Sequence, residues 1–262
     1  MFNMLSSDFY KLFKRKSFYF CAVLSVLSGM ISIFGLITIG ASYNFSISEI
    51  GEFFGFNGIG SIAPGLIAVN IFFIILASMF VPSEFSFGTI KNIVSRGISR
   101  TKIYISKLLI SWFLVLFYSI LSAMAAFSLG AYYWGVGDFS AQNVVLGIFR
   151  MLGLYLLSAM AFQSMFVMIG FLVRHTGGTV STSLGIVIVL PIVINFVKVF
   201  FTKTFKIENF NPEKYWVGSI IDEITKMDVT QEAITRGILV SCVYLVLFTL
   251  IGIYSFNKRD IK

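Results

Sequence analysis

Charged residues are scarce in this sequence. Aspartate, glutamate, lysine and arginine make up 12% of its 262 residues, whereas a typical soluble domain has about 25%. Hydrophobic residues make up 57%, and 30 of them are phenylalanine. One soluble core could not bury so much apolar surface. The composition therefore excludes an ordinary soluble domain and predicts a polytopic membrane protein, with residues 1–262 forming a single transmembrane domain.

Cysteine and histidine are also rare. Cys21 and Cys242 are the two cysteines, and both lie in apolar runs, so they form no disulfide framework. His175 is the single histidine, and no cysteine or carboxylate lies near it in the sequence. Metals are held by sets of such ligands. We therefore expect no metal site.

Several catalytic motifs are missing. The sequence contains no Gly-x-x-x-x-Gly-Lys-Ser/Thr phosphate loop, no Gly-x-Ser-x-Gly elbow and no His-Glu-x-x-His helix. Its apolar runs hold no paired carboxylates. We therefore expect that the chain is not itself an enzyme, that it does not hydrolyse ATP and that it binds no cofactor.

Six apolar runs are long enough to cross a bilayer. As a helix, 22 residues reach about 33 Å, which matches the thickness of the hydrocarbon core. The predicted fold is therefore all-α, with six transmembrane helices at residues 18–39, 62–81, 108–129, 144–173, 180–201 and 234–256.

An amphipathic helix is predicted ahead of the first run, at residues 1–16. Its apolar residues share one helical face, and its lysines and arginine lie away from that face. Such a helix lies in the plane of the membrane interface. The apolar face consists of Phe2, Leu5, Phe9, Leu12 and Phe13.

The net charge of +8 could suggest nucleic-acid binding, but the bases form short clusters beside apolar runs, without an aromatic and basic stripe. They predict topology instead, because lysine and arginine gather on the cytoplasmic side. Thirteen bases fall on one side, with three acids. We expect a bacterial cell-membrane protein with both termini and residues 82–103 in the cytoplasm. The outer loops are then 42–61, 130–143 and 202–233.

The most distinctive stretch is residues 81–107, which lies between two apolar runs and carries five bases. Pro82 is expected to end the preceding helix, since proline clashes in a helix interior. Ser83 and Ser86 can cap the short helix that comes after it. Gly97 predicts a turn, and the next helix begins near Ser99 or Thr101. The pattern predicts a short helix on the membrane surface.

The stretch contains Glu84, then Gly88-Thr89-Ile90-Lys91, then Gly97-Ile98-Ser99-Arg100, then Lys107. These residues resemble the first cytoplasmic loop of permease subunits of type-2 ABC exporters, of the kind that exports bacteriocins and antibiotics. The span pattern is similar over nearly the whole chain, although many members carry proline at the position of Gly97. In that family the loop forms a coupling helix that docks into a separate ATPase subunit. The resemblance implies coupling roles for Glu84, Gly88, Thr89, Lys91, Ser99 and Arg100.

The resemblance also implies a function. The chain would be the membrane subunit of an ATP-driven exporter of a peptide or amphipathic antibiotic. It would pair with a second permease subunit, identical or homologous, and with ATPase subunits that bind ATP and magnesium. Two alternatives stay open: a lipid or polysaccharide exporter of the same class, and a non-transporting membrane sensor or assembly protein.

Glu84 has two interpretations. It could be a solvated acid paired with nearby bases, or it could anchor the coupling helix to the ATPase. In both cases we expect an exposed charge that contributes little to folding. A docking role predicts that Arg100 shares an exposed face with Glu84.

Polar residues inside the apolar runs are candidates for a substrate path. These are Arg150, Gln163 and Asn195, although Arg150 lies near the end of its run and could instead extend its charge to the outer interface. Glycines in the same region are expected to allow close helix packing. The outer segment 202–233 contains an Ile220, Ile221 and Ile224 pattern that predicts a short amphipathic helix, which would cap the exit between the last two spans.

Overall fold

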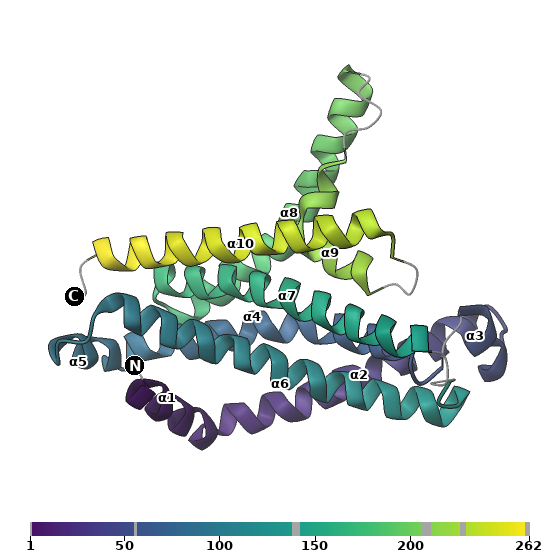
Figure 1. Ribbon diagram of the computed structural model, residues 1–262, viewed down its shortest axis with the longest axis horizontal. Helices are drawn as coiled ribbons and strands as arrows, with labels where there is room; N and C mark the ends of the chain where they lie inside the picture. The colour runs from purple at the N-terminus through teal and green to yellow at the C-terminus, as the bar shows by residue number, and fades with distance from the viewer. Residues whose placement is uncertain (1, 55–56, 138–141, 206–210, 226–228, 260–262) are drawn as a thin grey trace.

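The computed structural model describes residues 2–54, 57–137, 142–205, 211–225 and 229–259. For residues 2–3, 52–54, 71–79, 142–144 and 205 it describes the backbone only. Every regular element in these residues is a helix (Figure 1). Five of the helices are long and apolar enough to cross a membrane. These are α2 (Lys16–Ser42), α6 (Arg100–Trp134), α7 (Gln142–Val173), α8 (Thr176–Phe205) and α10 (Gln231–Lys258).

The remaining predicted span lies in α4 (Ile62–Ser86). This helix of 25 residues packs against α2, α6 and α7. Each of the six predicted runs thus lies within one long helix. The helices are longer than the runs, most of all α6, which begins at Arg100 rather than at residue 108. The predicted membrane span leaves out Lys107, because a lysine is costly in an apolar environment. In the structure this lysine is buried and paired.

The two ends of the bundle differ. The helix α1 (Phe2–Lys14), the short helix α5 (Thr89–Ser95) and the C-terminal end of α10 lie together at one end, on the left in Figure 1. The helix α3 (Ile47–Phe54) lies at the other end, inside the segment that was expected to be a loop. The segment 1–16 contains a helix as predicted, α1, which packs on α6 and α2; its position in a membrane interface stays a prediction.

The centre of the bundle is formed by α6 and α7, whose apolar stretches are the most buried among α2, α6, α7, α8 and α10. Along its length α10 packs against α7, and α2 packs against α6. Small residues bring α2, α4 and α6 together. A Cβ on Gly29 of α2 would collide with the backbone of Ser122, and a Cβ on Gly65 of α4 would collide with Ala126, one turn further along α6. The Ser122 hydroxyl donates a hydrogen bond to the carbonyl of Gly65, at 2.7 Å. Such close approach stabilises helix pairs in apolar surroundings.

The helix α8 behaves differently from the others. Its first half packs on α4 and α7, and its second half projects away from the bundle (Figure 1). Its most apolar stretch is not buried in the chain's own core.

The amphipathic helix predicted in the outer segment is confirmed as α9 (Val217–Ile224), which follows a single 3-10 turn, η1 (Pro212–Tyr215). Ile220, Ile221 and Ile224 are buried on one side of it. It packs on α7 and α10, while η1 contacts α8. Ile220 and Ile224 lie against Gly237 of α10. The segment thus reaches both of the last two long helices, α10 through α9 and α8 through η1, and α9 in addition packs on α7.

Candidate functional site

The short helix between α4 and α6 is present as predicted. α5 lies between Gly88 and Gly97, whose φ angles are +65° and +79°. A Cβ at either position would meet nothing within 4 Å, so glycine is favoured here by the backbone conformation and not by lack of space. Ile90 is buried and anchors α5 to the bundle. Ser99 is the residue that precedes α6, as expected, but its side chain makes no capping hydrogen bond.

The prediction that Pro82 ends the preceding helix is wrong. α4 continues through Pro82 to Ser86, which adds one further turn. Proline removes only one hydrogen bond near a helix end, and Pro82 is itself buried beside Gly170 of α7, which holds that turn in place. Ser83 and Ser86 do not cap α5. Their hydroxyls donate back to the carbonyls of Phe80 and Pro82.

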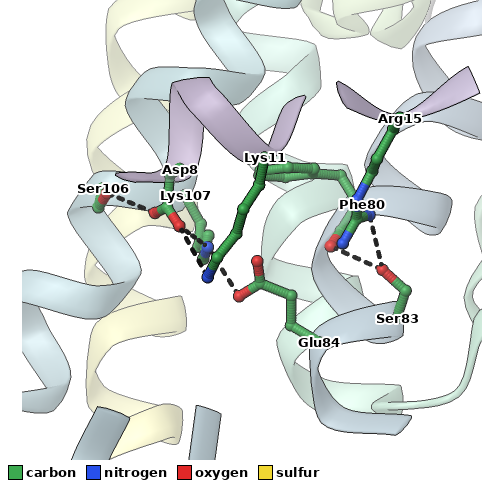
Figure 2. Close-up of polar contacts among 8 residues, drawn as sticks. All are labelled: Asp8, Lys11, Arg15, Phe80, Ser83, Glu84, Ser106 and Lys107. Atoms are coloured by element: carbon green, nitrogen blue, oxygen red, sulfur yellow. Dashed lines mark hydrogen bonds and ion pairs between the residues drawn. The ribbon is translucent and has the colours of Figure 1, made fainter. Parts of the chain in front are cut away.

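Three charged side chains meet in the interior beside α5 (Figure 2). The Lys107 Nζ of α6 lies 2.7 Å from Oδ1 of Asp8 in α1 and 2.7 Å from Oε2 of Glu84 in α4. The Ser106 hydroxyl donates a hydrogen bond to the other Asp8 oxygen, at 2.9 Å. All three charged side chains are at most 2% exposed. We call Asp8, Glu84 and Lys107 the ion cluster; it fastens α1 to both helices that flank α5.

Glu84 is therefore not the exposed acid that was expected. It is buried, because it follows Phe80 and Val81 on the inward face of α4. Its contact with Lys107 is an ion pair without hydrogen-bond geometry, and neither carboxylate oxygen accepts a hydrogen bond from the described residues. Removing one partner of a buried pair costs about 3–5 kcal/mol, whereas a surface pair contributes about 0–1 kcal/mol.

The charges of the ion cluster do not balance, since two carboxylates face one ammonium group. Lys11 offsets part of the excess, because its Nζ lies 3.9 Å from Asp8 Oδ1 at the edge of the cluster. Arg15 lies beside it, donating a hydrogen bond from Nη1 to the Ser83 hydroxyl at 3.1 Å. The cations of Arg15 and Lys107 also lie over the Phe80 ring, at 5.5 and 5.1 Å from its centroid.

Sequence reasoning missed the roles of Asp8 and Lys107, although a signal was present. Asp8 lies three residues after Leu5 and four before Leu12, which places it on the apolar face of α1. Lys107 lies three residues after Tyr104, which is fully buried. Opposite charges at inward positions of separate helices are the pattern of a buried ion pair, since each would be costly alone.

Arg100 does not share an exposed face with Glu84. Its Nη1 donates hydrogen bonds to three carbonyls at the C-terminal end of α10: those of Phe256, Asn257 and Arg259. Arg259 in turn donates from Nη1 to the carbonyl of Leu172, near the end of α7, at 2.8 Å. Cations are favourable beside the last carbonyls of a helix. Arg100 and Arg259 thus join the ends of α6, α7 and α10.

Positive charge accumulates at this end of the bundle. Burial lowers the pKa of the Arg174 guanidinium, and the positive charges of Arg259 and Arg100 lower it further. The Arg174 side chain lies over the ring of Phe85, 5.4 Å from its centroid. No three metal-ligating side chains come together in the part of the chain that the structure describes.

The exposed side of α5, which points away from the bundle, combines basic and aromatic side chains. Lys91, Asn92 and Arg96 are exposed, and Thr89 is half-buried. Phe87, which directly precedes Gly88, is 77% exposed. Aromatic residues and arginine are enriched at protein interfaces. We call Phe87, Lys91, Asn92 and Arg96 the α5 face.

The three residues expected on a substrate path are not brought together. Arg150 is exposed near the start of α7, whereas Gln163 is fully buried thirteen residues later, about 20 Å along the same helix. The amide of Gln163 makes no hydrogen bond to the described residues. Asn195 is exposed in the second half of α8. These positions do not form one path within a single chain.

One known family matches most of the chain. A family model described as "Protein of unknown function (DUF2705)" matches residues 19–262. A search of curated proteins found no match. The matched residues begin within α2, run through every later helix and include both Glu84 and Lys107. The chain therefore belongs to this family, the DUF2705 proteins of unknown function.

Proposed function

We propose that this protein is the membrane-spanning permease subunit of an ATP-driven exporter. In this proposal α2, α4, α6, α7, α8 and α10 are six spans, and α1 lies in the cytoplasmic interface. Both termini and α5 face the cytoplasm of a bacterial cell. A second permease subunit pairs with this one, separate ATPase subunits bind ATP and magnesium, and the cargo is a peptide or amphipathic antibiotic.

The observation that carries the proposal is the α5 face. α5 is held at both ends by glycine turns, is anchored inward by Ile90 and leaves Phe87, Lys91 and Arg96 exposed. A large ring that is 77% exposed has no role in the packing of this chain. Aromatic and arginine side chains are the most frequent hot spots of protein interfaces. The α5 face therefore suits a protein partner.

The ion cluster supports transmission of movement from such a partner. α5 is joined directly to α4 and α6, and Lys107 fastens both of these helices to α1 through Glu84 and Asp8. A push on α5 would thus act on α1, α4 and α6 together instead of bending one loop. Rigid-body movement of packed helices is a common way to convert a local contact into a larger change.

The test is retention of the ATPase by variants of the α5 face. The tagged protein is co-expressed with the ABC-type ATPases encoded in its source genome and purified in mild detergent. Phe87→Ala should reduce the retained ATPase by about 30-fold, the effect of a 2 kcal/mol hot spot. Tyr132→Ala is the matched control, because Tyr132 is 80% exposed at the far end of α6.

Two results would contradict the proposal. The first is that no ATP-hydrolysing subunit is retained by the unchanged protein. The second is that Phe87→Ala retains as much ATPase as Tyr132→Ala does. Because both rings are exposed, neither change should alter the elution profile of the protein itself.

A further inference from the structure

A cavity of about 500 Å³ lies between the start of α4, the second half of α6 and the first half of α7, away from α5, which joins the end of α4 to the start of α6. Side chains from all three helices line it, and all except Ser119 are apolar. Its volume is within the range of small-molecule sites, about 300–1,000 Å³. Lining residues include Leu66 of α4, Met124 and Phe127 of α6, and Phe149 and Gly153 of α7.

The cavity opens sideways, through an apolar rim. Ile120, Met124 and Phe149 line it and are also 47%, 64% and 70% exposed. Water would be a poor occupant, because a bound water needs two to four polar partners and Ser119 is the only polar lining residue. In a helix bundle that crosses a membrane, this opening faces hydrocarbon. A ligand would therefore enter from the bilayer and would itself be apolar along most of its length.

Arg150 supplies a charge beside this opening. It directly follows Phe149 and lies three residues before Gly153, so it is within one turn of two lining residues. Its side chain is exposed and makes no ion pair with the described residues. An arginine in this position is complementary to an anion, and its planar guanidinium suits phosphate in particular.

The length of α7 places this charge at a particular depth. Its 32 residues extend about 48 Å, and the hydrocarbon core is about 30 Å thick, so about 9 Å would remain outside at each end of a centred helix. Arg150 lies eight residues from the start, about 12 Å in. It is thus close to the boundary where lipid headgroups lie, and Gly153 and Leu156 are deeper, where acyl chains lie.

We propose that the cavity holds one acyl chain of an anionic phospholipid, whose phosphate is bound by Arg150. The proposal requires α7 to cross the membrane, but it requires neither an ATPase nor transport. It also accounts for Gly153 of α7. Gly147 and Gly153 were expected to allow close packing, yet a Cβ on either would meet nothing within 4 Å. At Gly153 the open space is the cavity itself.

The open space at Gly153 allows a selective test. Gly153→Leu fills the cavity without displacing any atom near the new Cβ, and leucine favours the helix more than glycine does. Gly147→Leu is the matched control, since it makes the same change on the same helix at a residue that does not line the cavity. Arg150→Gln removes the charge and keeps the length of a polar side chain.

The probe is phosphatidylglycerol with a diazirine on one acyl chain, compared with the corresponding phosphatidylcholine. The full-length protein is reconstituted in nanodiscs with each lipid, irradiated and mapped by mass spectrometry. Cross-links should form on the α6 and α7 residues that line the cavity. Phosphatidylglycerol should label them about fivefold more than phosphatidylcholine, the effect of one basic residue near an anionic surface.

Each variant should change one feature of this pattern. Gly153→Leu should abolish cavity cross-links, Gly147→Leu should leave them unchanged, and Arg150→Gln should make the two lipids label equally. Equal labelling of the unchanged protein by both lipids would overturn the proposal, as would unchanged labelling of Gly153→Leu. The experiment contains no ATPase, so its failure would be distinguishable from failure of the exporter proposal.

Discussion

Replacing Lys107 with methionine should destabilise this protein severely. Methionine keeps most of the length of the side chain and removes its charge. The ammonium group of Lys107 lies 2.7 Å from both Asp8 and Glu84, and all three side chains are buried. Without it, two carboxylates would face each other in the interior with only the partly exposed Lys11 nearby.

The size of the expected loss of stability follows from the burial of the ion cluster. Leaving a buried charge without its partner costs about 3–5 kcal/mol. For a chain of this size, 1 kcal/mol corresponds to about 2–4 °C in melting temperature, so the expected fall is about 6–20 °C. Asp8→Asn or Glu84→Gln should cost less, because each leaves one acid paired with Lys107. Because Glu84 is buried and paired with Lys107, Glu84→Ala should still lower stability, contrary to the expectation for an exposed acid.

The assay is the fraction of tagged protein that elutes as a single sharp peak from a sizing column in mild detergent after heating. Lys102→Met is the matched control, because Lys102 lies on the same helix but is exposed, and such changes stay within about 0.5 kcal/mol. The triple variant Asp8→Asn, Glu84→Gln and Lys107→Met should recover most of the lost stability, since neutral replacement of a whole buried cluster is often tolerated.

The reasoning would be refuted if Lys107→Met melted together with Lys102→Met. It would also be refuted if the triple variant were less stable than Lys107→Met. Either result would mean that the three charges are not held together in the interior.

Three further predictions concern topology, energy use and the outer segment. In a background without Cys21 and Cys242, Lys214→Cys should react with a membrane-impermeant thiol reagent in intact cells, and Asn92→Cys should not. External labelling of Asn92→Cys would show that the predicted orientation is wrong. The purified chain alone should hydrolyse no ATP in a phosphate-release assay, and turnover that survives removal of contaminating ATPases would contradict this. Amides of α9 should be protected in hydrogen exchange because its isoleucines are buried; uniform exchange there would indicate a flexible loop.

The sequence by itself determined the class of fold and the positions of the long helices. In a bilayer every backbone polar group must be satisfied within the chain, so a long apolar run with few charges has one main solution, a helix. The turn after α5 was also readable, because Gly97 lies where the chain reverses. The ends of helices were less predictable. Pro82 looks like a stopping point in the sequence, yet it lies inside α4. The start of α6 was predicted near Ser99, although the predicted membrane span leaves out Lys107.

Only the tertiary structure decided which faces of these helices are inside. Most long helices here are apolar all round, so helical periodicity does not separate a core face from a lipid face. The ion cluster joins residues 8, 84 and 107, and its pairing depends on how α1, α4 and α6 pack. The same packing left space at Gly153 and removed it at Gly29. Composition defines the helices, but the cost of burying each charge and the fit of each small residue depend on neighbours distant in the chain.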